Sequence, residues 1–361
     1  MAFFHYDNIK IAGIASAVPT QKITIESFAD SFGKETVEKF SKMTGVKEFR
    51  KTLEHQTASD LGFAAAERLL SEKNVSREEI GALVFIAHSV DYRRPATACV
   101  LHKRLGLSKD CATFDIGLGC SATVYGLQVV GSMMANSDIT KALLITGESL
   151  TKMVNPGDKS VAMLFGDGGS AILLEKKENS PLDVLLRTDG NGYNAIIAPA
   201  GGYRNMNAPC KDEVWPDGNV RNLYNTYMNG TNVFSFTITE VPAAIRDFIG
   251  RTGVGVEEYD CFAFHQANQY ISKQLAKKFK IPMEKMPLCL DRYGNTSAPA
   301  VTLALCDRYG DSHGEVVKTM FCCFGVGLSW GVASATINSD DILPIIETDE
   351  VFEEGIINEP F

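Results

Sequence analysis

Continuous apolar runs alternate with segments of helical periodicity along most of the chain. The runs at Ala82–Ala87, Lys141–Ile145 and Cys261–Phe264 are continuous rather than alternating, so they predict strands of a sheet that is covered on both faces. Thr57 and Asp60 have the spacing of a capping box and predict a helix start. Apolar residues three or four apart then mark two helical faces: Leu61, Ala64, Ala65 and Leu69, and later Ile271, Leu275 and Phe279. The pattern predicts an α/β fold.

A strand that leads through a turn into a helix occurs in both parts of the chain. In its first part, an expected strand at Ala112–Ile116 enters a glycine-rich turn at 117–120 and then a helix. In its second part, a buried strand leads into His265 and a helix in the same way. Each part closes with a glycine-punctuated segment, at 165–174 and at 324–331, which we expect to be a strand hairpin.

Two similar α/β halves are therefore expected, residues 1–176 and 177–337, followed by an acidic extension at 338–361. The boundary falls in the segment 176–226, which is rich in Gly, Asn and Pro and weakly periodic. Open α/β sheets bind their ligands at the carboxyl ends of the strands. We therefore expect the functional site where the strand ends of the two halves meet.

The composition narrows the class of protein. The chain has 361 residues, of which 45% are hydrophobic and 22% charged, and this excludes disordered, collagen-like and disulfide-scaffold proteins. No apolar run approaches the roughly 18 residues of a membrane span, and the N-terminus lacks a secretory pattern, so we expect a cytoplasmic protein without membrane association. Nine cysteines without a C-x-x-C pair predict reduced thiols rather than disulfides or a zinc site.

The negative charge is concentrated at the C-terminus. The formal net charge is −9, and residues 338–361 hold eight acids, including Glu359, and no Lys or Arg, so the rest of the chain is nearly neutral. A nearly neutral body excludes the basic surface that nucleic acid binding requires. We expect the extension to be a solvated segment rather than one that folds back on a partner subunit.

Cys120 is the first candidate for chemistry. It follows two glycines at an expected turn from strand to helix, so its sulfur should lie at a helix N-terminus, where unpaired amides lower the pKa of a thiol. The alternative is a small buried hydrophobe, because free cysteine is among the most buried residue types. A nucleophile also needs a partner that handles protons.

His265 and Asn295 are the candidate partners. His265 ends a buried strand and begins a helix, and Asn295 precedes another helix-like segment. Taken singly, each has a structural alternative, since a histidine at a strand end is often a satisfied structural residue and Gly-Asn is a common turn. Taken together with Cys120, they occupy the same place in the expected fold, the end of a strand or the start of the next helix.

These residues carry a family resemblance. Six segments in order, DIGLGCSATVYGL around Cys120, FGDGGSAILL, MNGTNVF, HQAN, DRYGNTSAPA and FGVGLSWG, resemble the β-ketoacyl-[acyl carrier protein] synthase III family, of thiolase-like fold. The resemblance spans residues 8 to 337. It implies a layered α-β-α-β-α core, a homodimer, and an acyltransferase of the condensing type that acts in fatty acid biosynthesis.

The resemblance also implies roles for individual residues. Cys120, His265 and Asn295 would be the catalytic triad of a decarboxylative Claisen condensation between an acyl thioester and a malonyl-[acyl carrier protein]. A further set would contact the thioester arm of the substrates: Lys159, Met228, Gly230, Asn268, Gly325, Val326 and Gly327. The partners are then acyl carrier protein and the two thioester substrates, and neither a metal nor a resident cofactor is expected.

Several positions depart from the family pattern. Lys39 and Met43 stand where members that use acyl-CoA carry a Trp and an Arg, which argues against CoA as the primer donor. Tyr270 replaces an Arg that has been implicated in carrier docking. Arg94 stands where an aromatic residue often reaches across the dimer interface, and a cation there would favour a polar or acidic acyl group. Basic residues of the expected helix after His265 could replace the missing Arg, or form a solvated face: Lys273, Lys277 and Lys278.

Two other functions remain open at this level. One keeps Cys120 and His265 but transfers the acyl group to an oxygen or nitrogen nucleophile without loss of carbon dioxide. The other is an inactive subunit that pairs with an active synthase.

Overall fold

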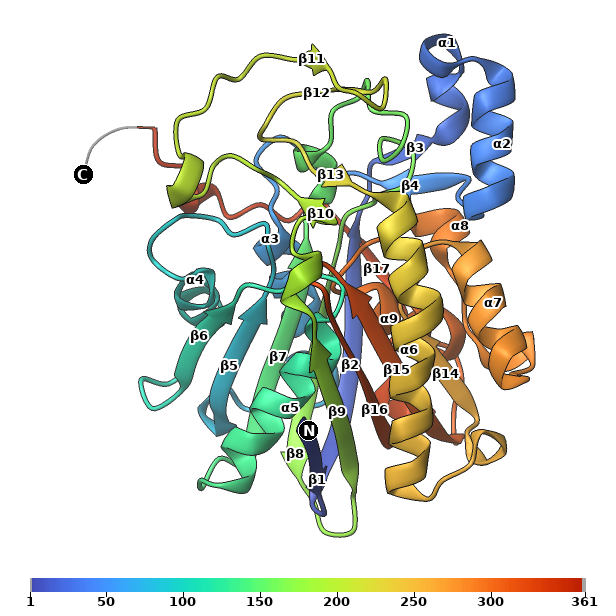
Figure 1. Cartoon of the computed structure of the whole chain (residues 1–361). Helices are drawn as coiled ribbons and strands as arrows, with labels where there is room; N and C mark the ends of the chain where they lie inside the picture. Colours follow the sequence, from blue (N-terminus) through green and yellow to red (C-terminus); the bar gives the residue numbers. More distant parts are fainter. Residues whose placement is uncertain (1, 359–361) are drawn as a thin grey trace.

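The computed structural model of the chain contains two main sheets and three layers of helices (Figure 1). The structure describes residues 2–358. Met1, at the start of the expected first half, and Glu359–Phe361, at the end of the expected extension, lie outside the described residues. The first sheet has six strands, in the order β17 (Ile346–Thr348), β2 (Ile9–Pro19), β8 (Gly168–Lys176), β7 (Lys141–Glu148), β5 (Ile80–Ile86) and β6 (Ala112–Ile116). The second has five, in the order β1 (Ala2–Tyr6), β9 (Leu182–Thr188), β16 (Ser329–Asn338), β15 (Val316–Gly325) and β14 (Cys261–Phe264).

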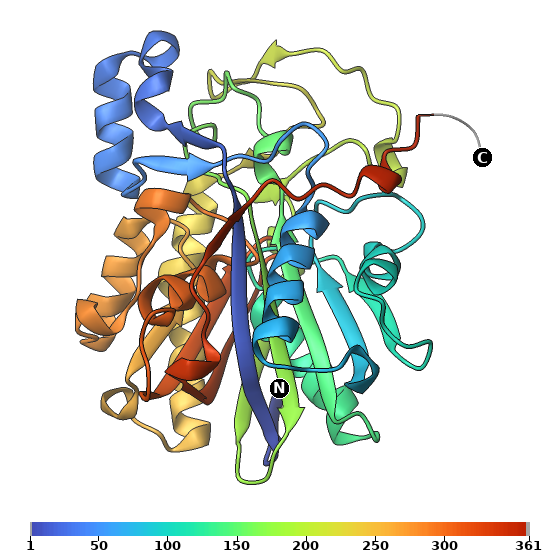
Figure 2. The ribbon, with the colours of Figure 1, turned by 180° about the vertical axis from the view of Figure 1, so that it is seen from behind.

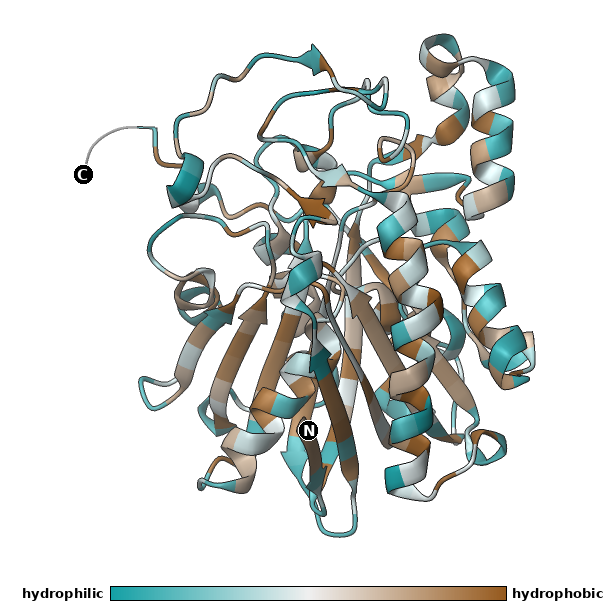
Figure 3. Cartoon of the chain, in the orientation of Figure 1, coloured by the Kyte–Doolittle hydropathy of each residue, from teal (hydrophilic) through white to brown (hydrophobic). Residues whose placement is uncertain are grey.

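The central layer consists of α5 (Ala122–Ala135) and α9 (Ala300–Tyr309), which share one apolar core with the inner faces of both sheets. Helices α3 (Ala58–Glu72) and α4 (Thr97–Arg104) cover the outer face of the six-stranded sheet. Helices α6 (Gly230–Thr252) and α7 (Gln269–Phe279) cover the outer face of the other. Figure 3 shows the hydrophobic strands enclosed by these helices. The expected five-layered α-β-α-β-α, thiolase-like core is confirmed.

The remaining strands and α-helices are short and lie mainly at the end of the molecule where the strands point (Figure 1). They are β3 (Lys22–Thr24), α1 (Ala29–Phe32), α2 (Lys34–Thr44), β4 (Glu48–Arg50), β10 (Ile196–Ile197), β11 (Glu213–Val214), β12 (Val220–Arg221), β13 (Tyr227–Met228) and α8 (Leu290–Tyr293).

Local sequence signals account for several elements. The expected capping box is present, because the backbone amide of Thr57 donates to Asp60 Oδ2 at 2.8 Å and so begins α3. Of the two glycine-rich segments expected to be hairpins, only the second forms a tight one, where Gly325 pairs with Ser329. The prediction of a hairpin at 165–174 was wrong, since this segment leads into β8, which pairs with β7 across a long connection.

The expected match between the helix after Cys120 and the helix after His265 was wrong. Helix α5, which follows Cys120, lies between the sheets, whereas α7, which follows His265, lies outside. The helix that matches α5 by position is α9, which follows Asn295. The division into 1–176 and 177–337 stays a proposal, and the two sheets exchange a strand at each chain end, because β1 joins the second sheet and β17 the first.

The acidic extension was expected to be solvated, and this is wrong. It folds back on its own chain: β17 pairs in parallel with β2, and Ile342 is buried (Figure 2). Its carbonyls at Thr348 and Glu350 accept hydrogen bonds from Gln56 Nε2. Its acids form ion pairs with basic residues of the body: Asp341 with Lys10 and Lys73, Glu347 with Arg50, Glu350 with Arg104, and Glu354 with Lys103.

Arg104 lies at the centre of the contact between the C-terminal extension and the rest of the chain. Its guanidinium donates to Asp60 at 2.7 Å and to Glu350 at 3.0 Å, and it stacks on the rings of Phe63 and Phe352. The side chains of Arg104 and Asp60 are 4% and 2% exposed. Cations from distant parts of the sequence therefore neutralise the acids of the extension, which a local reading of charge does not reveal.

Candidate active site

Loops from both sheets meet at one end of the fold. Cys120 follows β6, His265 follows β14, and each strand is parallel to its neighbour β5 or β15, so both side chains lie at carboxyl ends. Asn295 lies between α8 and α9, where its backbone amide donates to Leu164 O at 2.8 Å and its carbonyl accepts from Gly166 N at 3.2 Å. These backbone bonds fix the Asn295 turn against the first half of the chain.

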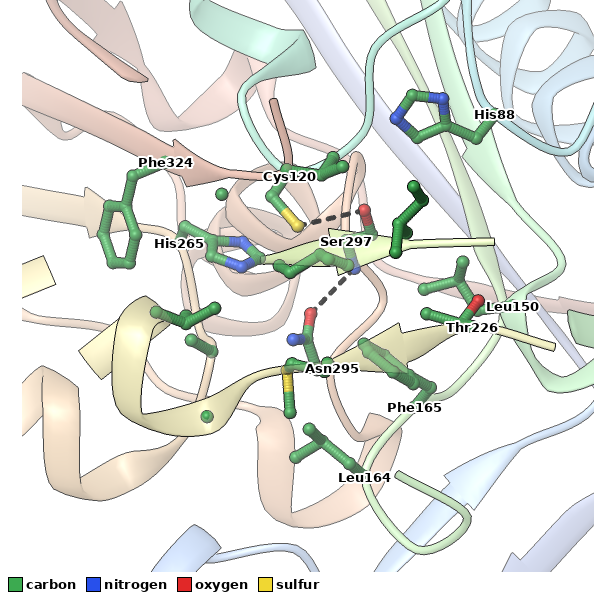
Figure 4. Close-up of a pocket in the computed structure, with 18 of the residues that line it drawn as sticks. His88, Cys120, Leu150, Leu164, Phe165, Thr226, His265, Asn295, Ser297 and Phe324 are labelled. Atoms are coloured by element: carbon green, nitrogen blue, oxygen red, sulfur yellow. Dashed lines mark hydrogen bonds between the residues drawn. The ribbon is translucent and has the colours of Figure 1, made fainter. Parts of the chain in front are cut away.

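The three side chains line a single cavity of about 560 Å³, as Figure 4 shows. Five residues expected to contact the thioester arm also line it: Met228, Gly230, Asn268, Gly325 and Val326. Two others, Lys159 and Gly327, are not among its lining residues, and Lys159 is exposed at the surface. No Lys, Arg, Asp or Glu is found in this lining among residues 2–358.

Cys120 is buried but borders the cavity. Its sulfur lies 3.3 Å from the hydroxyl of Ser297, and a Cβ added to Gly325 would lie 2.9 Å from it, so backbone approaches closely there. Burial raises the pKa of the Cys120 thiol, while the Ser297 hydroxyl and then the backbone amides of Val326 and Cys120 act to lower it. The expected net lowering of the pKa is wrong, because desolvation outweighs these dipoles.

His265 is an uncharged imidazole. It is 2% exposed, and burial lowers its pKa to about 4. Its ring meets the ring of Phe324 edge to face, with centroids 5.3 Å apart, and this contact fixes the plane of the imidazole. Its Nδ1 atom has no hydrogen-bond partner within the described part of the chain. The imidazole is thus available as a neutral hydrogen-bonding group.

Ser297, which sequence reasoning missed, links the other two groups. Its amide donates to Asn295 Oδ1 at 2.9 Å, and its hydroxyl meets the Cys120 sulfur (Figure 4). Because the Asn295 carbonyl oxygen is used in this way, the amide NH₂ is left to donate to a ligand. Ser297 has a φ of +59°, in the left-handed region, so its placement depends on turn geometry and has no signature in hydrophobic periodicity.

The pocket wall contains further residues that the sequence did not single out. His88, after β5, lies beside the turn that carries Cys120, because a Cβ on Gly119 would lie 2.8 Å from its Cδ2. Leu150, Phe165 and Thr226 line the same side of the cavity (Figure 4). The available signal was the position of His88 just after the run Ala82–Ala87, which was already expected to be a buried strand of a sheet covered on both faces.

The positions that depart from the family pattern lie outside the cavity. Arg94 is exposed and does not line it, Met43 is 59% exposed, and Lys39 pairs with Glu35 at 2.7 Å on the surface of α2. Within residues 2–358, no cluster of His, Cys, Asp or Glu has the arrangement of a metal site, and no helix has the length and hydropathy of a membrane span.

Fold and site together define a condensing acyltransferase of thiolase-like fold. The family models for 3-oxoacyl-[acyl-carrier-protein] synthase III match residues 114–190, and 249–337 for its C-terminal part. The chain is 32% identical to the β-ketoacyl-[acyl-carrier-protein] synthase III of Caldanaerobacter subterraneus, over 89% of this chain and 95% of that protein. It is also 32% identical to the Serratia proteamaculans protein of that name, over 90% and 98%.

A solved structure gives the same result. The crystal structure of a 3-oxoacyl-(acyl-carrier protein) synthase from Burkholderia xenovorans superposes with a TM-score of 0.89 at 31% identity, covering 96% of this chain and 99% of that one. The chain belongs to the 3-oxoacyl-[acyl-carrier-protein] synthase III family.

Proposed function

We propose that Cys120 is the acyl-accepting nucleophile and that His265 and Asn295 stabilise the enolate formed when a malonyl thioester loses carbon dioxide. The observation that carries the proposal is the convergence of one thiol, one neutral imidazole and one free carboxamide on a single cavity, in whose lining residues 2–358 place no Lys, Arg, Asp or Glu. A decarboxylation that generates an enolate needs neutral donors of this kind, since they stabilise the charge only when it appears.

In the first step, the Cys120 sulfur attacks the carbonyl carbon of an acyl thioester. The backbone amides of Cys120 and Val326, which already act on the sulfur, would hold the oxygen of the tetrahedral intermediate. The carbon–sulfur bond to the donor breaks, and the donor thiol leaves with the proton that Cys120 gives up. The product is an acyl-cysteine, and no charge remains in the cavity.

In the second step, a malonyl thioester binds with its carbonyl oxygen toward His265 and Asn295. Carbon dioxide leaves, the electron pair of the broken bond forms an enolate, and the two side chains donate hydrogen bonds to its oxygen. The α-carbon then attacks the acyl-cysteine carbonyl and forms the new carbon–carbon bond. The Cys120 sulfur leaves and takes up a proton, which restores the thiol.

The malonyl donor and acyl carrier protein as partner follow from the family. Exposed Lys273 and Lys277 on α7 begin about one turn beyond Asn268, which lines the cavity, and would meet an acidic carrier, whereas Lys278 is engaged with Ile238 O. Changing Lys273 and Lys277 together to Glu should raise KM for a carrier thioester but not for a short pantetheine thioester. Lys109→Glu, in the loop between α4 and β6 on the other side of the molecule (Figure 1), is the matched control.

We also propose a homodimer and a cytoplasmic location. Strand β6 is an edge of the six-stranded sheet in the single chain, and its Phe114 and Ile116 are only partly covered, so a second copy could extend the sheet. Native mass spectrometry should show a dimer that Phe114→Lys dissociates. A reducing compartment suits a mechanism that uses a free thiol, and all nine cysteines are free.

Intact-protein mass spectrometry with a panel of acyl-CoA and acyl-carrier donors tests the nucleophile. The adduct should vanish in Cys120→Ala and persist in Cys99→Ala, which removes an exposed cysteine instead. Adduct that persists in Cys120→Ala would refute the assignment. Labelled carbon dioxide should be released in proportion to product. Acyl transfer to an alcohol or amine without carbon dioxide would establish the alternative transferase, and an inert Cys120 would establish the inactive subunit.

A further inference from the structure

Asp167, in the segment 165–174, is a buried acid that the mechanism proposed above does not use. It is fully buried, and among residues 2–358 no Lys, Arg or His pairs with its carboxylate. Burial of a carboxylate is costly unless other groups compensate it, and burial raises the pKa of Asp167 accordingly. Hydrogen bonds must therefore supply the compensation, and the groups that donate them show what Asp167 holds in place.

Four hydrogen bonds reach the Asp167 carboxylate from two threonines. The backbone amide of Thr151 donates to Oδ1 at 2.9 Å. The Thr52 amide and hydroxyl donate to Oδ2, each at 2.8 Å, and the Thr151 hydroxyl donates to the same oxygen at 2.6 Å. Thr52 follows β4, whereas Thr151 lies in the 3₁₀ turn Leu150–Met153 after β7. One side chain thus joins three segments that are far apart in the sequence.

The backbone that leads into Asp167 holds the Asn295 turn. The amide of Gly166 donates to Asn295 O at 3.2 Å, and the amide of Asn295 donates to Leu164 O at 2.8 Å, so the two segments form a β bridge. The approach is close, since a Cβ on Gly166 would lie 2.1 Å from the backbone oxygen of Tyr293. Figure 4 shows Leu164 beside Asn295. A shift of this segment would therefore move Asn295 as well.

The direction of the Asn295 carboxamide depends on this backbone. Its Oδ1 atom accepts from the amide of Ser297, two residues later, so the turn determines where the NH₂ group points. A displacement of about 1 Å in such a group can lower a rate about 100-fold. Cys120 is placed by other elements, since it lies between β6 and α5, and the four donors to Asp167 come from neither element. Asp167 is therefore tied more directly to Asn295 than to the thiol.

We propose that Asp167 is a positioning residue for Asn295. Its carboxylate fixes the segment 164–167 against Thr52 and Thr151, and that segment fixes the turn from which Asn295 donates to the enolate. Asp167 lies outside the cavity lining, so its role rests on the function proposed above for Asn295. Loss of this carboxylate should slow the condensation step and leave the acylation of Cys120 nearly unchanged.

Asp167→Asn removes the anchor with little change of shape. Each carboxylate oxygen accepts from a backbone N–H, and an amide NH₂ can only donate, so the variant must lose one of these bonds. Acylation of Cys120, by whichever donor of the panel above reacts fastest, is followed by intact-protein mass spectrometry. The acylated protein, freed of donor, then receives malonyl-pantetheine, and the release of labelled carbon dioxide in a single turnover reports condensation.

The two rates should respond differently. We expect acylation to stay nearly unchanged in Asp167→Asn and condensation to fall about 100-fold. If Asp167 acts through the carboxamide of Asn295, Asp167→Asn should cause no further loss in a protein that already carries Asn295→Ala.

Asp60→Asn is the matched control, because Asp60 is also buried but bonds to Arg104 and to the C-terminal extension. It should lower the free energy of unfolding without changing the ratio of the two rates, and an equal change in that ratio would overturn the proposal. Should Asp167→Asn fail to fold, Thr52→Val and Thr151→Val each remove one hydroxyl donor to Asp167 and should give a smaller loss in the condensation step alone.

The outcomes separate the role of Asp167 from the proposed function. Unchanged condensation in Asp167→Asn would overturn the positioning role and leave Asn295 as the donor to the enolate. Equal slowing of both steps, or a further loss on top of Asn295→Ala, would show a general structural role and overturn it too. Failure of every donor to acylate Cys120 in the unmodified protein would refute the proposed function itself, and the role of Asp167 with it.

Discussion

The neutral state of His265 has a measurable consequence for stability. Burial lowers the pKa of this residue to about 4 in the folded protein, from an ordinary value of 6.5. Between those values the unfolded chain binds a proton that the folded chain does not. The free energy of unfolding therefore increases with pH in this window: the contribution is fully present above pH 6.5 and is lost as the pH falls toward 4. Between pH 7.5 and pH 5 the loss amounts to about 2 kcal/mol.

His265→Asn, which removes the titrating group, isolates this contribution. We expect the unmodified protein to lose about 2 kcal/mol more than the variant when urea unfolding is compared at pH 7.5 and pH 5. Buried Glu148 and Asp167 have raised pKa values, so their contributions change with pH in the opposite direction. They are present in both proteins and cancel in the difference. Equal losses in the two proteins would show that the imidazole is charged at pH 5 and would refute the argument for a neutral donor.

Three further substitutions test the site and the extension. Gly325→Ala places a Cβ 2.5 Å from that of Cys120 and should slow acylation about 100-fold by mass spectrometry; an unchanged rate would mean that the backbone there is not part of the site. Ser297→Ala removes a hydrogen bond that lowers the pKa of the Cys120 thiol, so alkylation of Cys120 by iodoacetamide should shift to higher pH. An unchanged pH profile would mean that the Ser297 hydroxyl does not act on the thiol. Arg104→Met removes the cation that pairs with buried Asp60 and should lower the free energy of unfolding by about 3–5 kcal/mol. Glu350→Gln should lower it by less than about 1 kcal/mol, because the Glu350 side chain is 40% exposed. Equal losses in the two variants would contradict the structure.

The fold was largely predictable because the buried strands are written as continuous apolar runs. The expected strand Cys261–Phe264 coincides with β14, and the expected strand at Lys141 extends three residues further as β7. The layer of each helix was harder to predict, since both layers share the 3.6-residue period. A signal did exist: α9 is apolar nearly all round and is buried between sheets, whereas α7 carries lysines on one side and lies outside.

The site was predictable where strand ends determine it and unpredictable where turns do. Cys120 and His265 follow parallel strands, so topology brings them to one edge. Ser297 depends on a left-handed turn, and Thr226 on an irregular loop, and neither conformation follows from periodicity. The prediction of a lowered pKa for the Cys120 thiol was wrong for another reason. The helix N-terminus at Cys120 was expected from the sequence, but the burial that outweighs its effect on the pKa is a property of the assembled fold.

The raised pKa of the Cys120 thiol and the lowered pKa of the His265 imidazole have the same electrostatic consequence. Both shifts keep the resting cavity uncharged, and its described lining contains no ionised side chain. Charge therefore arises only during reaction, on the tetrahedral oxygen or the enolate, where fixed dipoles stabilise it without reorganisation. Salt screens exposed charges but not such buried dipoles. Ionic strength should then affect the encounter with a carrier at Lys273 and Lys277, and hence KM, while kcat for the chemical steps stays nearly constant.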